Sequence, residues 1–255
     1  MSRRKLGEEM IIQKFGGAAM KDRAMRRLCI DRIQEGLNLN DKVIVVVSAI
    51  GRQESPYSTD RLLSITPSLK SSTAPWDLAA ACGELLASAV LSAELEEAGT
   101  PNRIMHSVNS GIRTIGSFGN ATIETIETSY IEQTFQDHNC LIIPGFQGMN
   151  AAGDYMTLGR GGSDLTAIAL GSSLDASHVE FFKDVPGVMS ADPHIYPDAK
   201  KFDSLTIDEF LPLLDCARPI IQKRAALHAK KTAIPLCVRG IAVAEEGTWI
   251  VPHSS

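Results

Sequence analysis

Residues 43–49 read Val-Ile-Val-Val-Val-Ser-Ala, a run of apolar β-branched residues without polar alternation. Such a run is typical of a strand that helices cover on both faces. A similar apolar run occurs at 10–15 (MIIQKF), and residues 23–37 between the two carry apolar side chains near helical spacing. Asp22 stands where it can cap that helix. The first part of the chain therefore predicts a βαβ unit with parallel strands.

The same alternation continues along the chain. Residues 76–98 predict a long helix that ends at Gly99, and residues 53–72 are rich in Ser, Thr and Pro and are typical of a loop. We expect further strands at 103–108, 140–144, 178–182, 235–238 and 248–251, and helices at 123–136, 163–174, 207–214 and 220–231. Strands separated by helices indicate a single three-layer αβα domain with a mainly parallel sheet, in which two lobes surround a crevice.

Composition and charge exclude several classes of protein. The 255 residues include 25 basic and 30 acidic side chains, so a net charge of −5 argues against nucleic-acid binding by a basic face. The five cysteines form no C-x-x-C pair, which indicates neither a disulfide framework nor a structural zinc site. No apolar run approaches the ~20 residues of a membrane span. The N-terminus lacks the hydrophobic region of a signal peptide. We expect a cytoplasmic protein without membrane or nucleic-acid partners.

Two glycine-rich turns follow predicted strands, where open α/β sheets bind ligands. In Lys14-Phe15-Gly16-Gly17, glycine amides beside a lysine could hold a phosphate, but the tetrapeptide fits a plain strand-to-helix turn equally well. Residues 159–164 (GRGGSD) run into a predicted helix whose free amides favour an anion. Ser163 or Asp164 could instead cap that helix. Arg160 suits a carboxylate or phosphate, and the combination favours function.

Two acidic residues also stand out. Asp184, in Phe-Lys-Asp-Val-Pro-Gly-Val at 182–188, could face a ribose or a metal-bound phosphate, or simply cap its own turn. Glu84 lies inside the apolar pattern of the long helix, between Gly83 and Leu85. A partly buried glutamate needs a cationic partner, and the ammonium group of a substrate would serve. The chain contains neither a Walker P-loop nor a G-x-G-x-x-G dinucleotide motif.

The order of the motifs resembles that of the aspartokinases, within the amino acid kinase superfamily. The matching segments, in chain order, are K-F-G-G, V-V-V-S-A, G-E-L-L, G-F-Q-G, L-G-R-G-G-S-D-L-T-A and D-V-P-G-V-M-S-A-D-P. The likeness covers residues 11–251, and the segment 48–63 is most similar to lysine-pathway aspartokinases of Gram-positive bacteria. The resemblance implies an open eight-stranded sheet, and ATP-dependent phosphorylation of an acidic amino acid, with L-aspartate giving 4-phospho-L-aspartate. It also implies Mg²⁺ carried by the ATP phosphates, without protein ligands, and a homodimer.

The resemblance also implies roles for individual residues. Lys14 would bridge the phosphates in the transition state, and Asp164 would orient Lys14 or the metal-bound phosphate. The implied acceptor-binding residues are Ser48, Thr59, Glu84, Arg160 and Ser163, with Arg160 on the carboxylate and Glu84 on the ammonium. The implied nucleotide-binding residues are Gly16, Gly17, Lys183, Asp184, Val188, Asp192 and Arg218. We expect an N-terminal extension (1–9) and one kinase domain (10–255), with its amino-acid lobe at about 10–150 and its nucleotide lobe at about 151–251.

Several residues depart from the family pattern. Ala18-Ala19 replace Thr-Ser, Lys183 replaces a threonine, His194 replaces an arginine, and residues 216–222 read CARPIIQ where G-A-K-V-(L/I)-H-P is usual. Arg218 keeps the charge of that lysine. The retained charged residues favour an active kinase. The alternatives are a catalytically silent regulatory subunit, and a kinase for another acceptor such as acetylglutamate, carbamate or a nucleoside monophosphate. Since the chain stops before the ACT domains common in aspartokinases, we expect a bare catalytic unit.

Overall fold

The structure is a computed structural model, and it describes residues 9–52, 55–191, 195–196, 198–216, 218–243 and 245–252. Its main sheet has eight strands in the order β10-β12-β11-β9-β1-β2-β6-β3. They are β1 (Met10–Phe15), β2 (Lys42–Val47), β3 (Arg103–Ile104), β6 (Cys140–Pro144), β9 (His178–Lys183), β10 (Ser204–Thr206), β11 (Leu236–Gly240) and β12 (Thr248–Val251). Every neighbouring pair is parallel except β11 with β12. The expected open, mainly parallel eight-stranded sheet is confirmed.

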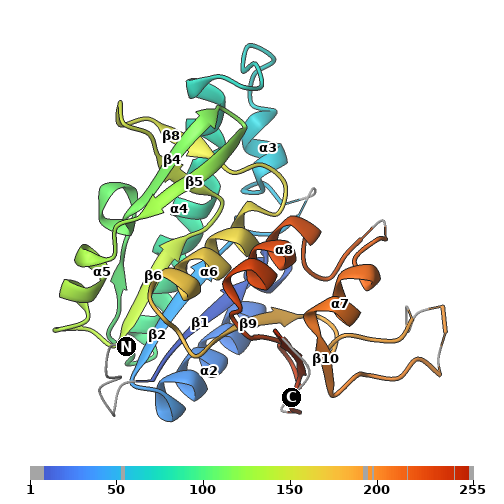
Figure 1. Cartoon of the computed structure of the whole chain (residues 1–255). Helices are drawn as coiled ribbons and strands as arrows, with labels where there is room; N and C mark the ends of the chain where they lie inside the picture. The colour runs from blue at the N-terminus through green and yellow to red at the C-terminus, as the bar shows by residue number, and fades with distance from the viewer. Residues whose placement is uncertain are drawn as a thin grey trace.

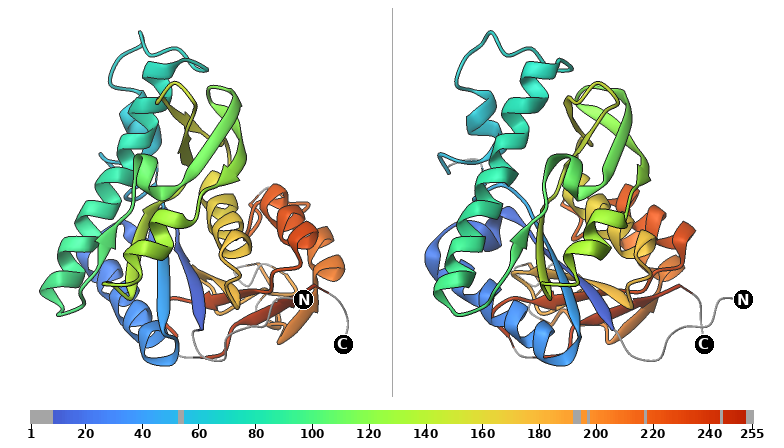
Figure 2. Two further views of the ribbon diagram at one scale, coloured as in Figure 1. Left: turned by 60° about the vertical axis from the view of Figure 1, so that its left-hand side comes forward. Right: turned by 90° about the vertical axis from the view of Figure 1, so that its left-hand side faces the viewer.

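Helices cover both faces of this sheet (Figures 1 and 2). On one face, α2 (Arg23–Leu39) and α4 (Ala74–Glu97) pack against residues such as Ile11 and Val45. On the other face, Ile12 and Val46 belong to a core that α5 (Ser129–Thr134), α6 (Gly162–Ser173), α7 (Ile207–Leu213) and α8 (Lys223–Thr232) complete. Because successive strand residues point to opposite faces, both faces need apolar residues, as the runs in β1 and β2 provide. The three-layer architecture is confirmed.

A second sheet of four strands, which the periodicity did not reveal, lies beside the upper half of α4 (Figure 1). Its order is β5 (Asn120–Ile126), β4 (Ile112–Ser117), β7 (Gln147–Met149) and β8 (Tyr155–Thr157). The helix expected over 123–136 is therefore wrong in its first part. The segment 122–126 (TIETI) is rich in Thr and Ile and pairs with β4, which favours a strand. The expected division of the lobes near residue 150 stays a prediction, and the hairpin β7–β8 crosses it.

Shorter elements differ from the sequence expectations as well. The loop expected at 53–72 contains α3 (Thr59–Leu63), and the strand expected at 103–108 is only β3 followed by a 3₁₀ helix at Ser107–Ser110. A further short helix, α1 (Gly17–Met20), follows β1 directly. Contrary to the expectation that no run has membrane-spanning length, α4 is long and apolar enough by composition. Its buried face packs in the core of this fold, and a core helix passes the same test.

The sheet topology creates a switch point at the centre of the molecule. From β1 the chain continues to its neighbour β2, and it returns to the other side of β1 only with β9. Beyond the carboxyl ends of such diverging strands the connections run apart and leave a crevice. Asp22 caps the N-terminus of α2 as predicted, because its Oδ1 accepts the Met25 amide at 2.8 Å.

Candidate active site

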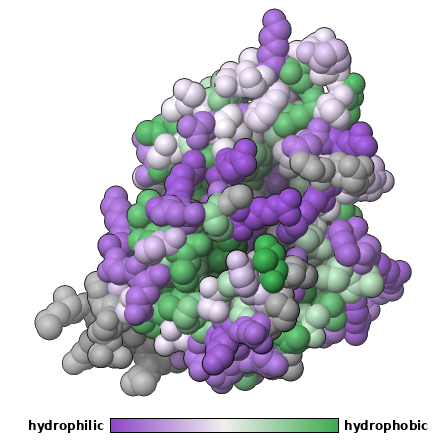
Figure 3. All heavy atoms as spheres, turned by 90° about the vertical axis from the view of Figure 1, so that its right-hand side faces the viewer, coloured by the Kyte–Doolittle hydropathy of each residue, from purple (hydrophilic) through white to green (hydrophobic). Residues whose placement is uncertain are grey.

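A cavity with a volume of about 760 Å³ lies at this switch point, a size that suits a small-molecule site. Side chains from the ends of β1, β2 and β9 meet residues of α3 and α4 and the turn before α6 there. Figure 3 shows hydrophilic side chains gathered around a hollow between the upper and lower parts of the molecule. Of the sequence-predicted site residues, those that line the cavity are Lys14, Gly17, Ser48, Thr59, Glu84, Arg160, Ser163, Asp164 and Lys183.

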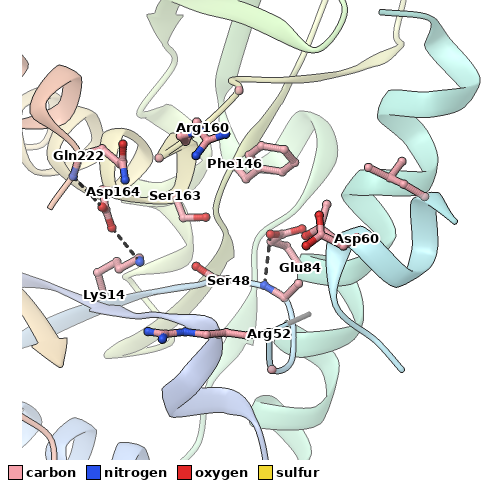
Figure 4. Close-up of a pocket in the computed structure, with 18 of the residues that line it drawn as sticks. Lys14, Ser48, Arg52, Asp60, Glu84, Phe146, Arg160, Ser163, Asp164 and Gln222 are labelled. Atoms are coloured by element: carbon pink, nitrogen blue, oxygen red, sulfur yellow. Dashed lines mark hydrogen bonds and ion pairs between the residues drawn. The ribbon is translucent and has the colours of Figure 1, made fainter. Parts of the chain in front are cut away.

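Lys14 and Asp164 form a buried ion pair in the wall of the cavity (Figure 4), with 2.7 Å between Lys14 Nζ and Asp164 Oδ1. Lys14 projects from β1 toward the α6 side of the sheet, and Asp164 lies in the first turn of α6. Burial alone would raise the pKa of Asp164, but the charges of Lys14 and Lys183 and the amide of Gln222 lower it below its usual range. The structure brings the two expected catalytic residues together as an ion pair.

The turn before α6 shapes one side of the cavity. Gly161 forms the N-cap with a φ of 73°, a conformation that favours glycine. A side chain there would also collide with Gln222. Neither Ser163 nor Asp164 caps the helix, so that alternative is wrong. Asp164 instead accepts the backbone N–H of Gln222 at 3.3 Å while it holds Lys14.

Glu84 lies on the opposite side of the cavity from Lys14 in Figure 4, with Ser48 and Ser163 between them in that view. Its side chain is buried, and Oε1 accepts the Ala49 amide at 3.2 Å. Gly83 permits this approach of α4, because a Cβ at Gly83 would lie 2.8 Å from the Cβ of Ala49. The second oxygen, Oε2, is buried without a hydrogen-bond partner among the described residues. Burial raises the pKa of Glu84 to about 8.

Several expected nucleotide-binding residues do not line the cavity. Arg218 is exposed outside it, and Val188 is a core residue whose amide donates to Thr248 Oγ1 at 2.9 Å. Asp184 is exposed next to Lys183. Gly16 lies close to the Lys14 side chain, because a Cβ added to Gly16 would be 3.6 Å from Lys14 Nζ. Asp192 and His194 lie outside the described residues. Ala18 and Ala19, which replace the usual hydroxyl residues, do not line the cavity either.

The cavity also contains side chains that the sequence analysis did not select. The most prominent are Arg52, Asp60, Trp76, Phe146 and Gln222. Arg52 and Asp60 lie in the segment 48–63, and Phe146 lies in the G-F-Q-G motif, so both motifs held a signal for them. Gln222 ends the segment 216–222 that departs from the family pattern, and no comparable signal marked Trp76. Phe146 has a φ of 73°, which is strained for an aromatic residue and places its ring against the cavity.

Metal ligands can be assessed from the same geometry. The described part of the chain contains no group of three or more His, Cys, Asp or Glu side chains that could hold a metal ion. The carboxylates in the cavity wall are Asp164, which pairs with Lys14, Glu84, which accepts the Ala49 amide, and Asp60, which lies beside Glu84 in Figure 4. A cation that enters this cavity therefore needs ligands of its own, such as the oxygens of a bound polyphosphate.

Two curated proteins are similar to this chain in sequence. Aspartokinase 1 of Bacillus subtilis is 35% identical over 249 residues, which are 97% of this chain and 62% of the relative. A Helicobacter pylori aspartokinase is also 35% identical, over 95% of this chain and 59% of its own length. This chain thus spans about three fifths of these relatives.

Solved structures share the fold. Escherichia coli aspartokinase III, in complex with aspartate and ADP, superposes with a TM-score of 0.82 at 23% identity, over 97% of this chain and 65% of that chain. UMP kinase from Ureaplasma parvum gives a TM-score of 0.66 at 14% identity, over 96% and 100% of the two chains. The model of the amino acid kinase family matches residues 9–246. The chain belongs to the amino acid kinase family.

Proposed function

We propose that this protein transfers the γ-phosphoryl group of ATP to the side-chain carboxylate of an acidic amino acid, with L-aspartate as the first candidate. The observation that carries the proposal is the polarity of the cavity. Lys14 and Lys183 stand at one side, and Glu84, with an unpartnered oxygen, stands at the other. Relatives named aspartokinases, and a similar fold solved with aspartate and ADP, support it.

The chemistry requires positioning more than acid–base catalysis. A carboxylate is ionised at neutral pH, so one of its oxygens attacks the γ-phosphorus without a general base. The new bond joins that oxygen to phosphorus, and the bond to the β–γ bridging oxygen breaks, so ADP leaves with the electron pair. The main obstacle is the approach of two anions. The Lys14 ammonium, fixed by Asp164 at 2.7 Å, would offset that repulsion.

The acceptor would lie between Arg160 and Glu84. The planar guanidinium of Arg160 suits the α-carboxylate of an amino acid. The partnerless Oε2 of Glu84 would accept a hydrogen bond from the ammonium group, which would also drive Glu84 into its ionised form. Ser48, Thr59 and Ser163 line the space between and would complete the pocket. ATP would bring Mg²⁺ on its phosphates.

The test is an assay of the purified full chain with Mg-ATP and a panel of acceptors. We would supply L-aspartate, L-glutamate, N-acetyl-L-glutamate and UMP, trap acyl phosphate with hydroxylamine and measure ADP release in parallel. Hydroxamate that forms with L-aspartate and not with the other acceptors is the expected result. Nucleotide binding without product from any acceptor would instead favour a silent regulatory subunit, the reading that the exposed position of Arg218 supports.

The remaining expectations stay proposals of the same kind. We propose that residues 10–150 contribute most acceptor contacts and residues 151–251 most nucleotide contacts. Arg160 and Ser163 are exceptions that would reach the acceptor from the second part. A homodimer in the cytoplasm is expected, and light scattering of the purified chain would measure its mass.

A further inference from the structure

The turn that carries Arg160 consists of residues with wide conformational freedom. Residues 159–161 read Gly-Arg-Gly, and both glycines have a φ of 73°. Glycine adopts this conformation at little cost, but it also leaves the backbone free to change it. The Arg160 side chain is exposed at the edge of the cavity (Figure 4). Its position therefore depends on the groups that pack around the turn.

Two segments that are far apart in sequence pack against this turn. At its first glycine lies the tip of the β4–β5 hairpin, because a Cβ added to Gly159 would be 2.9 Å from Asn120 Oδ1 and 3.2 Å from the Gly119 carbonyl oxygen. At its second glycine lies the start of α8, because a Cβ added to Gly161 would collide with the Gln222 side chain. The turn is thus held between the hairpin tip and α8.

Arg224, in the first turn of α8, connects these parts by hydrogen bonds. Its Nη2 donates to the carbonyl of Leu158, the residue directly before the turn, and its Nη1 donates to Asn120 Oδ1 at 3.3 Å. The guanidinium fork can reach two acceptors at once, which a lysine ammonium matches poorly. Neither oxygen carries a charge, and no carboxylate of a described residue pairs with Arg224. The side chain is therefore committed to the turn and the hairpin tip.

We propose that Arg224 is a positioning residue for Arg160. Together with Asn120 it clamps the turn in the orientation in which the Arg160 guanidinium binds the carboxylate of the acceptor. This role rests on the proposed function, because it takes Arg160 as an acceptor-binding residue. Arg224 itself does not line the cavity, so it acts on binding only through the turn.

The clamp also joins the two groups proposed to bind the acceptor. Gly119, the neighbour of Asn120, donates its amide to Asp77 Oδ2 at 3.0 Å at the start of α4. The same helix carries Glu84. Contacts therefore run from α4 through the hairpin tip to α8 and to the turn before α6. They would fix the separation between the ammonium-binding group and the carboxylate-binding group.

The experiment is steady-state kinetics of the full chain in the hydroxamate assay. Arg224→Met should raise the KM for L-aspartate about tenfold and leave kcat and the KM for ATP within about twofold of the wild type, because the reacting groups keep their positions. Arg224→Lys keeps the charge but not the fork, so its KM for L-aspartate should lie between the two. The matched control is Lys231→Met, which removes an exposed lysine at the other end of α8 and should show wild-type kinetics.

Asn120→Ala tests the second half of the clamp. It removes one of the two oxygens that Arg224 binds, so it should raise the KM for L-aspartate less than Arg224→Met does. If the two residues act together, the double variant should have the KM of Arg224→Met alone. Effects that multiply in the double variant would show that Asn120 acts independently, and would overturn the clamp.

Hydrogen exchange gives a readout that does not depend on catalysis. Within the turn, the Gly162 amide donates to the Gly159 carbonyl at 2.9 Å. Its exchange should be faster in Arg224→Met than in the wild type or in Lys231→Met, because the turn opens more often.

The inference is overturned if Arg224→Met loses only unfolding free energy and keeps the wild-type KM for L-aspartate, or if exchange in the turn is unchanged. Those results would leave the proposed kinase function intact. A folded wild-type chain that phosphorylates no acidic amino acid would instead overturn the proposed function together with this inference.

Discussion

Two neighbouring residues of β1, Gln13 and Lys14, carry buried polar groups on opposite faces of the main sheet. On the α2 side, Gln13 Nε2 donates to Glu180 Oε2 at 2.9 Å and to the Arg32 carbonyl at 3.0 Å. On the α6 side, Lys14 pairs with Asp164 at the cavity. The two faces show how the same strand supports a scaffold on one side and a site on the other.

The network on the α2 side is nearly closed. Arg239 donates to Glu180 at 2.7 Å and to Glu35 at 2.9 Å, and Arg32 donates to Glu35 at 2.6 Å. Burial would raise the pKa of Glu180, but its hydrogen bonds and the Arg239 charge hold that pKa below its ordinary value. The network joins β1, β9, β11 and α2, and none of its described residues lines the cavity. Its charges therefore stabilise the fold.

The α6 side leaves polar groups without protein partners. Glu84 Oε2 is buried without a hydrogen bond among the described residues, and Lys183 faces the same cavity. Unpartnered buried groups cost stability, and some lie outside the cavity, such as Gln13 Oε1, but Glu84 Oε2 is a carboxylate oxygen at a cavity, where a ligand can complete it. The site therefore contains a buried carboxylate oxygen without a protein partner, whereas the charged groups of the scaffold network pair with one another.

The comparison predicts that Lys14→Met is the most damaging change for activity. Loss of the ammonium leaves the transferring phosphoryl group without its main compensating charge, so kcat should fall about 10³-fold or more. The side chain borders a cavity and methionine keeps its length, so the variant should still fold by circular dichroism, although it loses unfolding free energy because the buried Asp164 loses its partner. Hydroxamate formation with aspartate measures the effect, and Lys70→Met serves as the control. Full activity of Lys14→Met would refute the catalytic assignment.

On the scaffold side, Arg239→Met should damage stability instead. It removes the partner of Glu180 and Glu35 and leaves a buried carboxylate uncompensated, at a cost of about 3 kcal/mol in unfolding free energy. Urea denaturation would measure this loss, and kcat of the folded variant should remain near that of the wild type. The matched control is Arg27→Met, because Arg27 forms an exposed pair with Asp31 at 3.4 Å and should contribute little. Equal losses in both variants would contradict the assigned scaffold.

Glu84→Gln sharpens the contrast through pH. The folded-state pKa of about 8 lies above the ordinary value of 4.5, so the unfolded state loses the proton first as the pH rises. The wild-type chain is therefore destabilised progressively between these two values, by about 1.4 kcal/mol per pH unit. Glutamine does not titrate, so the stability of the variant relative to the wild type should increase across this window. Urea denaturation from pH 5 to pH 8 measures the difference.

Glu96→Gln, on the exposed face of the same helix, is the control for that series and should show no such trend. Glu84→Gln should also raise the KM for aspartate, because a neutral amide attracts the ammonium group less. A stability difference that stays constant with pH would mean that Glu84 is ionised in the folded chain.

The sequence predicted the strands of the main sheet because each is a short apolar run that can be identified from its own residues. The apolar runs of β1 and β2 lie where they were expected, and the glycine turn at 159–162 does precede a helix at the cavity. Lys14, Glu84 and Asp164, which the motifs singled out, all line the cavity, Lys14 near the end of a strand and the two acids on helices α4 and α6. In an open parallel sheet, residues at the carboxyl ends of strands lie near the ligand crevice, so a strand end alone predicts this position.

Features that depend on distant pairing were not predictable from local patterns. Strand β5 was mistaken for a helix, because its partner β4 is what settles its conformation. The network of Gln13, Glu180 and Arg239 joins three strands that lie far apart in sequence. Likewise, the exposed position of Arg218 outside the cavity could not be predicted from its local sequence.

Asp77 provides the smallest and most discriminating test, because it joins the scaffold to the site. It is fully buried in the first turn of α4, and it accepts hydrogen bonds from the amides of Gly119 and Thr157 at 3.0 and 2.6 Å. Its chain neighbour Trp76 and its partner Gly119 both line the cavity. Both amides donate to Oδ2, while Oδ1 accepts the Thr157 hydroxyl at 3.1 Å. Asp77→Asn can keep both backbone bonds through its carbonyl oxygen, but it removes the negative charge and the acceptor for Thr157, so we expect a loss of about 1 kcal/mol in unfolding free energy.

The same change should raise the KM for the acceptor more than it lowers kcat, since it loosens the cavity wall without removing a charge from the reacting groups. Urea denaturation and the hydroxamate assay would measure the two effects separately. Asp22→Asn is the matched control: Asp22 caps the exposed start of α2, and asparagine caps a helix equally well. If Asp77→Asn changed stability but not KM, Asp77 would belong with the closed network on the α2 side. A shift in KM would show that buried polar groups can serve both the scaffold and the site.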